Sequence, residues 1–230
     1  MPVNRRYPNA LISRILPRGC VMLSLCFALQ GQSIAQSTSD SACGNPFRNH
    51  FGPWDYRVAS QHDKQLVETA HFTPGIESLT RPVNSTLHNI AGDISYTLAV
   101  FPNHHRALIS MVRLGERHKS DQPPSSTYTI DCYFRRATTF VPDDTVVRAL
   151  YALYLAKKGQ QAAAVQQLKT AEGFAKDNPL SNYNLGLVYF EIGEFESALV
   201  QAHKAIALGY GRTELADKLK AANKWAEPGG

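Results

Sequence analysis

The chain has 230 residues, of which 43% are hydrophobic and 19% charged, a balance typical of a folded globular protein and not of a disordered one. Its formal net charge of +5 is concentrated at the start, because Arg5, Arg6, Arg14 and Arg18 lie in the first 35 residues, which contain no acidic residue. Removing these four from the 24 basic residues leaves 20 against 19 acidic ones. This nearly neutral remainder lacks the basic surface typical of nucleic-acid-binding proteins.

The first 35 residues have the pattern of a secretion signal. The arginines are followed by an apolar run of 11 residues from Gly19 to Leu29, and then by Ser33-Ile34-Ala35, a small-x-small cleavage site. A run of 11 apolar residues is too short to span a bilayer. We therefore predict that residues 1–35 are cleaved, and that the mature protein is periplasmic or secreted, with no stable membrane insertion.

Cleavage would leave two cysteines, Cys43 and Cys132. In an oxidising compartment only one intramolecular pairing is possible, a disulfide that ties the start of the mature chain to a later helix. The alternative is two free thiols, with Cys132 packed in its helix as a small apolar residue. Both alternatives stay open, because two cysteines in a sequence do not reveal the distance between them.

Residues 36–89 are predicted to form an irregular N-terminal region that is rich in aromatic residues. Its large aromatic side chains follow neither a helical nor an alternating period; they are Phe47, Phe51, Trp54 and Tyr56. Such side chains are too costly to leave in water, so we expect them to pack against the rest of the protein. A short helix is expected over residues 63–71, and Thr73-Pro74 has the pattern of another helix start.

From residue 90 onward the chain carries a repeat of 34 residues. Gly193 follows Gly159 by this distance, and Ala198 follows Ala164. The stretch from Asn182 to Tyr189 contains a Leu-Gly pair with a tyrosine three residues after the glycine. This pattern resembles the tetratricopeptide repeat (TPR), which reads W-x2-L-G-x2-Y, continues with small residues, and has a 34-residue period.

The resemblance implies an all-α, TPR-like helix-turn-helix solenoid over residues 90–225. The predicted repeats lie at about 101–144 with a loop insertion at 117–128, at 145–178 and at 179–212, followed by a capping helix at 213–225. Lys220 stands where a further repeat would have a small residue, which favours an end to the array. The phrases HFTP, DISYTL, PNHHRAL and YNLGLVYF also look like those of small secreted bacterial TPR proteins without assigned chemistry.

The resemblance also implies a binding groove, because the first helix of each TPR unit lines a concave face. The apolar centre of this groove would consist of Ile109, Val112, Leu153, Ala156, Leu187 and Phe190, and its rim of His105, Arg106, Arg113, Lys157, Tyr183, Asn184 and Glu191. An exposed apolar groove is a liability unless something covers it. A partner peptide could cover it, or residues 43–80 could, and we expect the second because that segment also needs burial.

We therefore predict a scaffold or adaptor of the cell envelope that binds a protein or peptide. We expect no catalytic residue, no metal and no cofactor. The alternative is a small metal- or thiol-dependent envelope enzyme, with a site between the N-terminal region and the repeats that could use His71, His104 or Cys132. No HExxH or paired Cys/His spacing favours that alternative, and histidines at helix starts commonly form ordinary hydrogen bonds. No G-x-S-x-G motif or phosphate-binding glycine loop is present.

Overall fold

The computed structural model describes residues 42–80 and 89–227, and every regular element in these ranges is a helix. The all-α prediction is therefore confirmed. The chain divides into two units, Met1–Thr38 and Ser39–Gly230, and the described residues all belong to the second. The predicted signal segment, residues 1–35, lies outside them. None of the described helices combines the length and the apolar content needed to cross a membrane.

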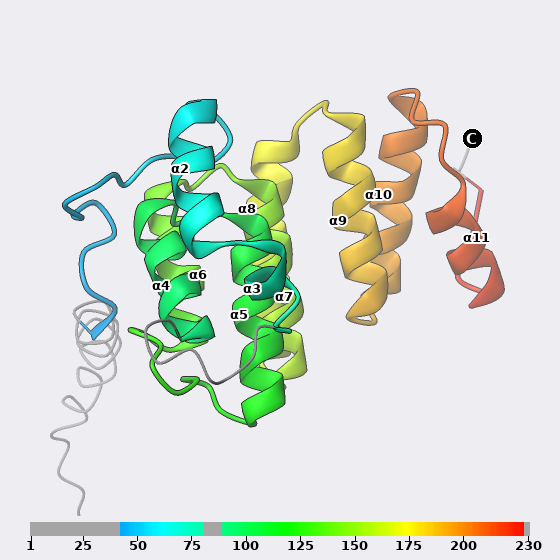
Figure 1. Ribbon diagram of the computed structural model, residues 1–230. Coiled ribbons are helices and arrows are strands. Elements are labelled where there is room, and N and C mark those ends of the chain that lie inside the picture. The colour runs from blue at the N-terminus through cyan, green and yellow to red at the C-terminus, as the bar shows by residue number, and fades with distance from the viewer. Residues whose placement is uncertain (1–41, 81–88, 228–230) are drawn as a thin grey trace, which may run out of the picture. The chain divides into compact units, whose positions relative to one another are not determined.

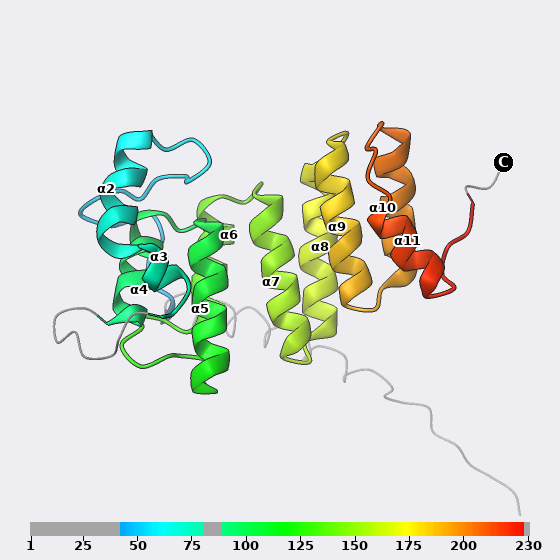
Figure 2. The same ribbon diagram turned by 45° about the vertical axis from the view of Figure 1, so that its right-hand side comes forward.

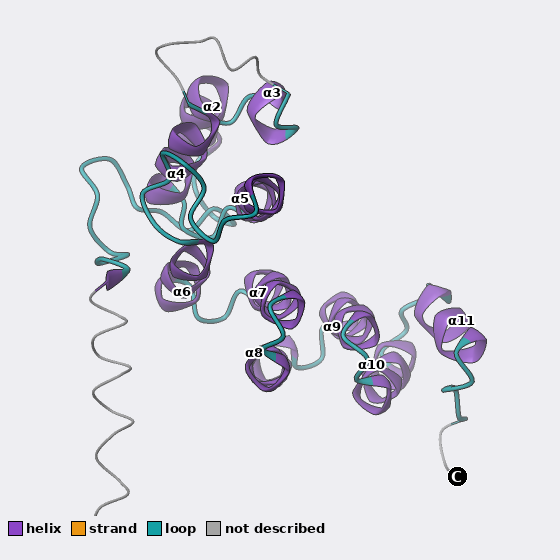
Figure 3. Ribbon diagram, turned by 90° about the horizontal axis from the view of Figure 1, so that it is seen from below, coloured by secondary structure: helices purple, strands orange, loops and turns teal. Residues whose placement is uncertain are grey.

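The helices form two rows, which Figure 3 shows from one end of the helices. The helices are α2 (Gln61–His71), α3 (Pro74–Glu77), α4 (Ile90–Val100), α5 (His105–His118), α6 (Ile130–Phe140), α7 (Thr145–Lys157), α8 (Gln161–Ala175), α9 (Pro179–Glu191), α10 (Phe195–Ala207) and α11 (Glu214–Ala221). One row contains α3, α5, α7, α9 and α11, and the other contains α2, α4, α6, α8 and α10 (Figures 1 and 3). Consecutive helices therefore alternate between the rows, as helix-turn-helix units do in a solenoid.

Sharp turns separate the helices of each unit. The α7–α8 and α9–α10 turns contain Gly159 and Gly193 at φ values of 74° and 84°, a conformation that glycine adopts without steric cost. The next unit begins with a polar cap: the side chain of Asp144 accepts hydrogen bonds from the first backbone N–H groups of α7, and Asn178 does the same for α9. These turns and caps recur with the sequence period, which is why the units stack regularly (Figure 2).

Small residues let the helices of the C-terminal repeats approach closely. A Cβ atom at Gly186 of α9 would lie 3.2 Å from the Cβ of Gln201 in α10 and 2.4 Å from a methyl group of Leu215 in α11. Ala198, Ala202 and Ala205 of α10 are buried. Large side chains on α9, such as Tyr189, then fill the space between units, so that the buried residues form one continuous core.

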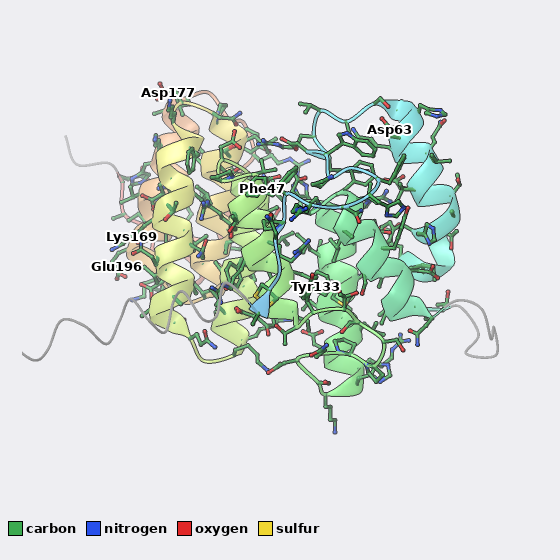
Figure 4. All side chains as sticks on the ribbon, turned by 90° about the vertical axis from the view of Figure 1, so that its left-hand side faces the viewer. Phe47, Asp63, Tyr133, Lys169, Asp177 and Glu196 are labelled. Atoms are coloured by element: carbon green, nitrogen blue, oxygen red, sulfur yellow. A yellow bond between two sulfur atoms is a disulfide. The ribbon has the colours of Figure 1, made fainter. Side chains whose placement is uncertain are left out.

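The N-terminal region adds α2 and α3 to the two rows, and its first segment runs across the row that contains α4 and α6. α2 packs on α4, and the one-turn helix α3 lies against α4 and α5. The segment that carries Phe47 crosses the side formed by α4 and α6 (Figure 4). Cys43 and Cys132 form a disulfide with a Cα–Cα distance of 5.1 Å, so this segment is bonded to α6. The buried guanidinium of Arg136 donates to the carbonyl of Cys43 at 2.9 Å.

Candidate functional site

A hollow of about 230 Å³ lies between α7 and α9. It is lined by Thr145, Val146, Ala149, Leu150 and Leu153 of α7 and by Ser181, Asn184, Leu185, Leu187 and Val188 of α9. Three of the predicted groove residues, Leu153, Asn184 and Leu187, meet here. The walls are apolar, and three short polar side chains contribute hydrogen-bonding groups. We refer to this site as the α7–α9 hollow.

Helical periodicity explains why these side chains share one face. On α7 the lining residues recur every three to four positions from Val146 to Leu153, while Ala152 and Leu155 on the opposite face are buried in the core. α9 repeats the arrangement, with Leu187 in the hollow and Tyr189 in the core. Val146 at the end of the hollow is 38% exposed, which is unusual for a large apolar side chain.

A second hollow, of about 410 Å³, lies between the ends of α5 and α7. Its lining comprises Val112, Gly115, Glu116, Lys119, Ser120, Asp121, Ile130, Tyr154, Lys157 and Lys158, so it contains the predicted residues Val112 and Lys157. Two ion pairs cross it: Lys157 to Glu116 at 2.8 Å, and Lys158 to Asp121 at 2.5 Å. This hollow is therefore much more polar than the α7–α9 hollow.

The loop between α5 and α6 forms one wall of this second hollow. The backbone N–H of Ile130 donates to the carbonyl of Asp121, which closes the loop at its base. At the other end of the loop, the backbone N–H groups of Thr127 and Tyr128 donate to the hydroxyl of Tyr133. Burial, and then the charge of Asp121, raises the pKa of Tyr154 to about 12, so this hydroxyl stays protonated at neutral pH.

The predicted rim residues of α5 contact other parts of the chain. Arg106 donates to Glu77 at 2.9 Å and to Glu68 at 3.2 Å, and the Nε2 of His105 lies 2.8 Å from Asp144. Of the other predicted residues on this helix, Ile109 is half-buried and Arg113 is exposed. The α5 end of the predicted groove is thus occupied mainly by internal ion pairs.

At the other end, Glu191 forms an ion pair with Lys218 of α11 at 3.2 Å. The ammonium of Lys218 also lies 5.5 Å from the centre of the Phe190 ring, and Phe190 meets Phe195 edge-on at 5.3 Å. These contacts hold the predicted residues Phe190 and Glu191 against neighbouring helices.

Tyr183 does not lie on the rim as the repeat pattern predicts. It is only 3% exposed, its ring packs on Tyr210 at 4.6 Å, and its hydroxyl donates to Glu214 at 3.3 Å. Burial raises the pKa of this hydroxyl, and the charge of Glu214 raises it further. The prediction was wrong because the connection to α11 folds over this position, which the position of a residue within a repeat does not reveal.

Residues 43–80 reach only the α5 end of the predicted groove, where Glu68 and Glu77 pair with Arg106, and do not fill the rest of it as expected. The aromatic side chains of this segment pack on a different apolar surface, at the end of α4. Trp54 and Tyr56 contact Phe101, at 6.1 Å and 5.6 Å between ring centres. Phe47 packs on Phe140 at the end of α6, at 5.5 Å. No residue of the described part of this segment lines either hollow.

A buried polar cluster joins the N-terminal segment to the helix starts of α5 and α7. The amide of Asn103 donates to Asp55 at 2.7 Å and to Asp144 at 3.0 Å, while its oxygen accepts from the backbone N–H of Tyr56. Burial alone would raise the pKa of Asp144, but hydrogen bonds from His105 and Asn103 outweigh it and lower that pKa. The cluster is a structural joint. In the sequence it is visible only as two Pro-Asn/Asp pairs at helix starts.

His104 is a second joint and does not resemble a metal ligand. Its Nδ1 accepts a hydrogen bond from the backbone N–H of Ala107, so its Nε2 carries the proton and donates to Glu68 at 3.1 Å. Burial lowers the pKa of His104 to about 4, which keeps the ring neutral. His71 lies 3.0 Å from Asp93. Within residues 42–80 and 89–227, no group of three or more His, Cys, Asp or Glu side chains could hold a metal ion.

Comparison with protein families identifies one match: residues 154–193 fit the family model described as a TPR repeat. The matched segment begins in α7, contains all of α8 and ends just after α9, so it spans the junction between two units. Comparison with curated proteins and with solved structures gave no match.

Proposed function

The chain contains tetratricopeptide repeats, and on that premise we propose that it is a scaffold of the cell envelope that binds a protein partner through the α7–α9 hollow. Repeats of this family are protein-interaction scaffolds in general, since stacked units present an extended concave surface. The observation that carries the proposal is the apolar lining of this hollow, which the N-terminal segment leaves uncovered.

The chemistry of the hollow favours an extended peptide with apolar side chains. Leu153, Leu187 and Val188 offer apolar walls for a side chain of the partner. The amide of Asn184 is exposed and can both donate to and accept from a peptide backbone, and the hydroxyl groups of Ser181 and Thr145 add to this. A few polar groups on an apolar wall fix the orientation of a ligand, while apolar burial supplies most of the affinity.

The proposed location rests on the start of the sequence. Basic residues, an apolar run of 11 residues and Ser33-Ile34-Ala35 together form a secretion signal. The test is the N-terminal sequence of the mature protein after fractionation of the native host. A mature chain that begins at Gln36 in the envelope or the medium supports the proposal, and an uncleaved chain in the cytoplasm contradicts it.

Binding is tested by photo-crosslinking in the native envelope with full-length protein that carries a photoreactive residue at Val146. We expect a defined crosslinked partner, and we expect Leu187→Glu to abolish it because the charge would be desolvated in an apolar site. The matched control is Val200→Glu, which changes an exposed valine of α10 that lines neither hollow. Equal capture by both variants, with unchanged thermal unfolding, would contradict the proposed site.

A further inference from the structure

The second hollow, between the ends of α5 and α7, contains a polar group that the fold does not use. Tyr154 of α7 lines this hollow and is only 7% exposed. The other buried tyrosines of the described ranges all bond through their hydroxyl groups, as Tyr151 does to Asp131 and Tyr189 does to Glu172. The Tyr154 hydroxyl makes no hydrogen bond to any described residue, although a buried tyrosine hydroxyl ordinarily has a partner.

This hydroxyl is accessible from the hollow. In the described part of the chain, the buried polar side-chain atoms that have neither a partner nor accessible surface belong to Asn182, Gln201 and His203. The oxygen of Tyr154 is not one of them, so it keeps accessible surface where its residue meets the hollow. The volume of about 410 Å³ is within the range of sites that bind small molecules. A molecule in the hollow can therefore bond to this oxygen.

The repeat pattern does not account for this hollow. The connection between α5 and α6, residues 119–129, is longer than the α7–α8 and α9–α10 connections, residues 158–160 and 192–194, and its first residues form one wall. The residue 34 positions after Tyr154 is Val188, so the repeat does not require a hydroxyl group here. A side chain that departs from its repeat and leaves a polar group unbonded indicates a functional site more than a packing need.

Apolar surface lies beside the hydroxyl. The side chains of Val112 and Ile130 line the same hollow, the first half-buried and the second buried. They suit a ligand that has an apolar face and polar edges, because apolar burial supplies affinity while a few polar groups fix the orientation.

Charged groups of both signs surround this surface. Lys157 pairs with Glu116 at 2.8 Å, and Lys158 pairs with Asp121 at 2.5 Å. Exposed ion pairs of this kind are weak, so each group is free to turn toward a ligand. A ligand hydroxyl accepts from an ammonium and donates to a carboxylate. A ligand with several hydroxyl groups therefore bonds to both members of a pair and leaves the charges balanced.

A charged ligand fits this lining less well. A cation would meet the lysine ammonium groups, and an anion would meet the carboxylates of Glu116 and Asp121. Burial raises the pKa of Tyr154, and the charge of Asp121 raises it further, so negative charge acts at the hydroxyl itself. Lys119 gives the lining one more ammonium than carboxylates, but this side chain is exposed and its charge is screened by salt.

We propose that the second hollow binds a neutral sugar, with one sugar hydroxyl bonded to Tyr154 and others bonded to the ion pairs of Lys157 and Lys158. The C–H face of the sugar ring would lie against Val112 and Ile130. No residue lines both this hollow and the α7–α9 hollow, so either proposal can fail without the other.

The test uses full-length protein with carbon-labelled tyrosine rings and proton–carbon NMR. The neutral probes are glucose, galactose and mannose, and the charged analogues are glucuronate and glucosamine. The signal that is missing in Tyr154→Phe identifies the Tyr154 ring among the ten tyrosines. We expect at least one neutral sugar to shift this signal saturably, and both charged analogues to bind more weakly than the best neutral sugar.

Affinities of the variants are measured by saturation-transfer NMR on the sugar. Tyr154→Phe should bind it about threefold to tenfold more weakly, the loss expected for one neutral hydrogen bond, with unchanged thermal unfolding. Lys157→Met, which changes an exposed side chain, should also weaken binding. The matched controls are Tyr210→Phe and Lys169→Met, which line neither hollow and should bind the sugar as the native protein does.

Three results would overturn the proposal. The first is the absence of a saturable Tyr154 shift with all three neutral sugars. The second is equal sugar binding by native protein and Tyr154→Phe. The third is tighter binding of glucuronate or glucosamine than of any neutral sugar, which would mean that the hollow selects a charge. The comparison of probes on native protein decides even if a variant alters the fold.

Discussion

The two ends of the described chain are held together by different kinds of contact. From α7 to α11, small residues such as Gly186 and Ala198 bring neighbouring helices together over an apolar core. From the N-terminal segment to α6, the apolar core continues, but a disulfide, aromatic pairs, and buried polar joints at Asn103 and His104 are added to it. The first kind links residues less than one repeat apart, as Gly186 is to Gln201 and Leu215, and the second links residues up to 93 positions apart.

This difference determines how each end should respond to substitution. Contacts between adjacent repeats are similar and numerous, so a change in one unit is felt mainly by its neighbours. A joint such as Asn103 connects three separate segments through one side chain, with the exposed ion pair of Arg57 and Asp143 beside it. We therefore expect the largest losses of stability at the N-terminal joints and smaller, local ones in the repeats.

The largest effect is expected from removal of the disulfide. The bond closes a loop across 89 positions, and the chain-entropy treatment of such a loop gives about 3–5 kcal/mol of stability. The double variant Cys43→Ser, Cys132→Ser should lose this amount in urea unfolding. Hydrogen exchange should locate the loss in α4 to α6, with α9 and α10 protected as before. A uniform loss in all helices would contradict the distinction between the two ends.

The next effect is a dependence of stability on pH that comes from His104. The pKa of this histidine is lowered from 6.5 to about 4 in the folded protein, so below pH 6.5 the unfolded chain takes up a proton that the folded chain does not. Stability should therefore fall between pH 6.5 and pH 4, by up to about 3 kcal/mol. His104→Asn, which keeps a capping side chain, should flatten this part of the curve.

The control for this experiment is His62→Asn, since His62 lies exposed near the start of α2. It should leave the pH curve unchanged. Glu68 contributes in the same direction at lower pH: burial alone would raise its pKa, but hydrogen bonds from Tyr56 and His104 lower it overall. The stability that the charged Glu68 contributes is lost as the pH falls below the ordinary pKa range of glutamate. A curve that is the same for native protein and His104→Asn would contradict the role of His104.

A smaller loss is expected in the repeats, from Gly186→Ala. The added methyl group would lie 2.4 Å from a methyl of Leu215, which can move, and 3.2 Å from the Cβ of Gln201, which is fixed to α10. We expect a loss of about 1–2 kcal/mol, measured by urea unfolding, because overpacking forces neighbouring helices apart. Hydrogen exchange should place the loss in α9 to α11, and a gain in stability would contradict the packing described here.

The smallest effect has the opposite sign. Gly173 lies inside α8, and a Cβ there would meet no atom within 4 Å. Gly173→Ala should therefore stabilise the protein by about 0.5–1 kcal/mol, since alanine favours a helix over glycine and nothing opposes it. Thermal unfolding of Gly173→Ala, measured beside that of Gly186→Ala, compares the same substitution at an open position and at a crowded one. A loss of stability at Gly173 would mean that α8 has a neighbour on that face.

The repeats could be predicted from the sequence because their contacts recur with the sequence period. Gly159 and Gly193 mark turns, and Ala164 and Ala198 mark helix contacts, so spacing alone predicts the fold. The α7–α9 hollow follows from the same periodicity. The destination of the aromatic segment and the burial of Tyr183 could not be predicted in this way, because both depend on contacts between segments that no period relates.

A hollow of about 470 Å³ at the C-terminal end of the two rows illustrates a further limit. Its lining comes from α10, α11 and the residues on either side of α11, such as Trp225, and the sequence identified Lys220 only as a departure from the repeat pattern. That a departure of this kind leaves a space depends on the side-chain positions of all these segments.

The disulfide also has a consequence for the covalent continuity of the chain. Cys43 and Cys132 enclose the N-terminal segment, α2 to α5 and the loop before α6 in one covalent ring. A single proteolytic cut anywhere between residues 44 and 131 opens this ring but releases no fragment from it. The cut protein gains only the mass of one water and keeps all its segments until a reductant separates them. Size measurements under oxidising conditions that do not resolve this small difference therefore do not reveal the cut.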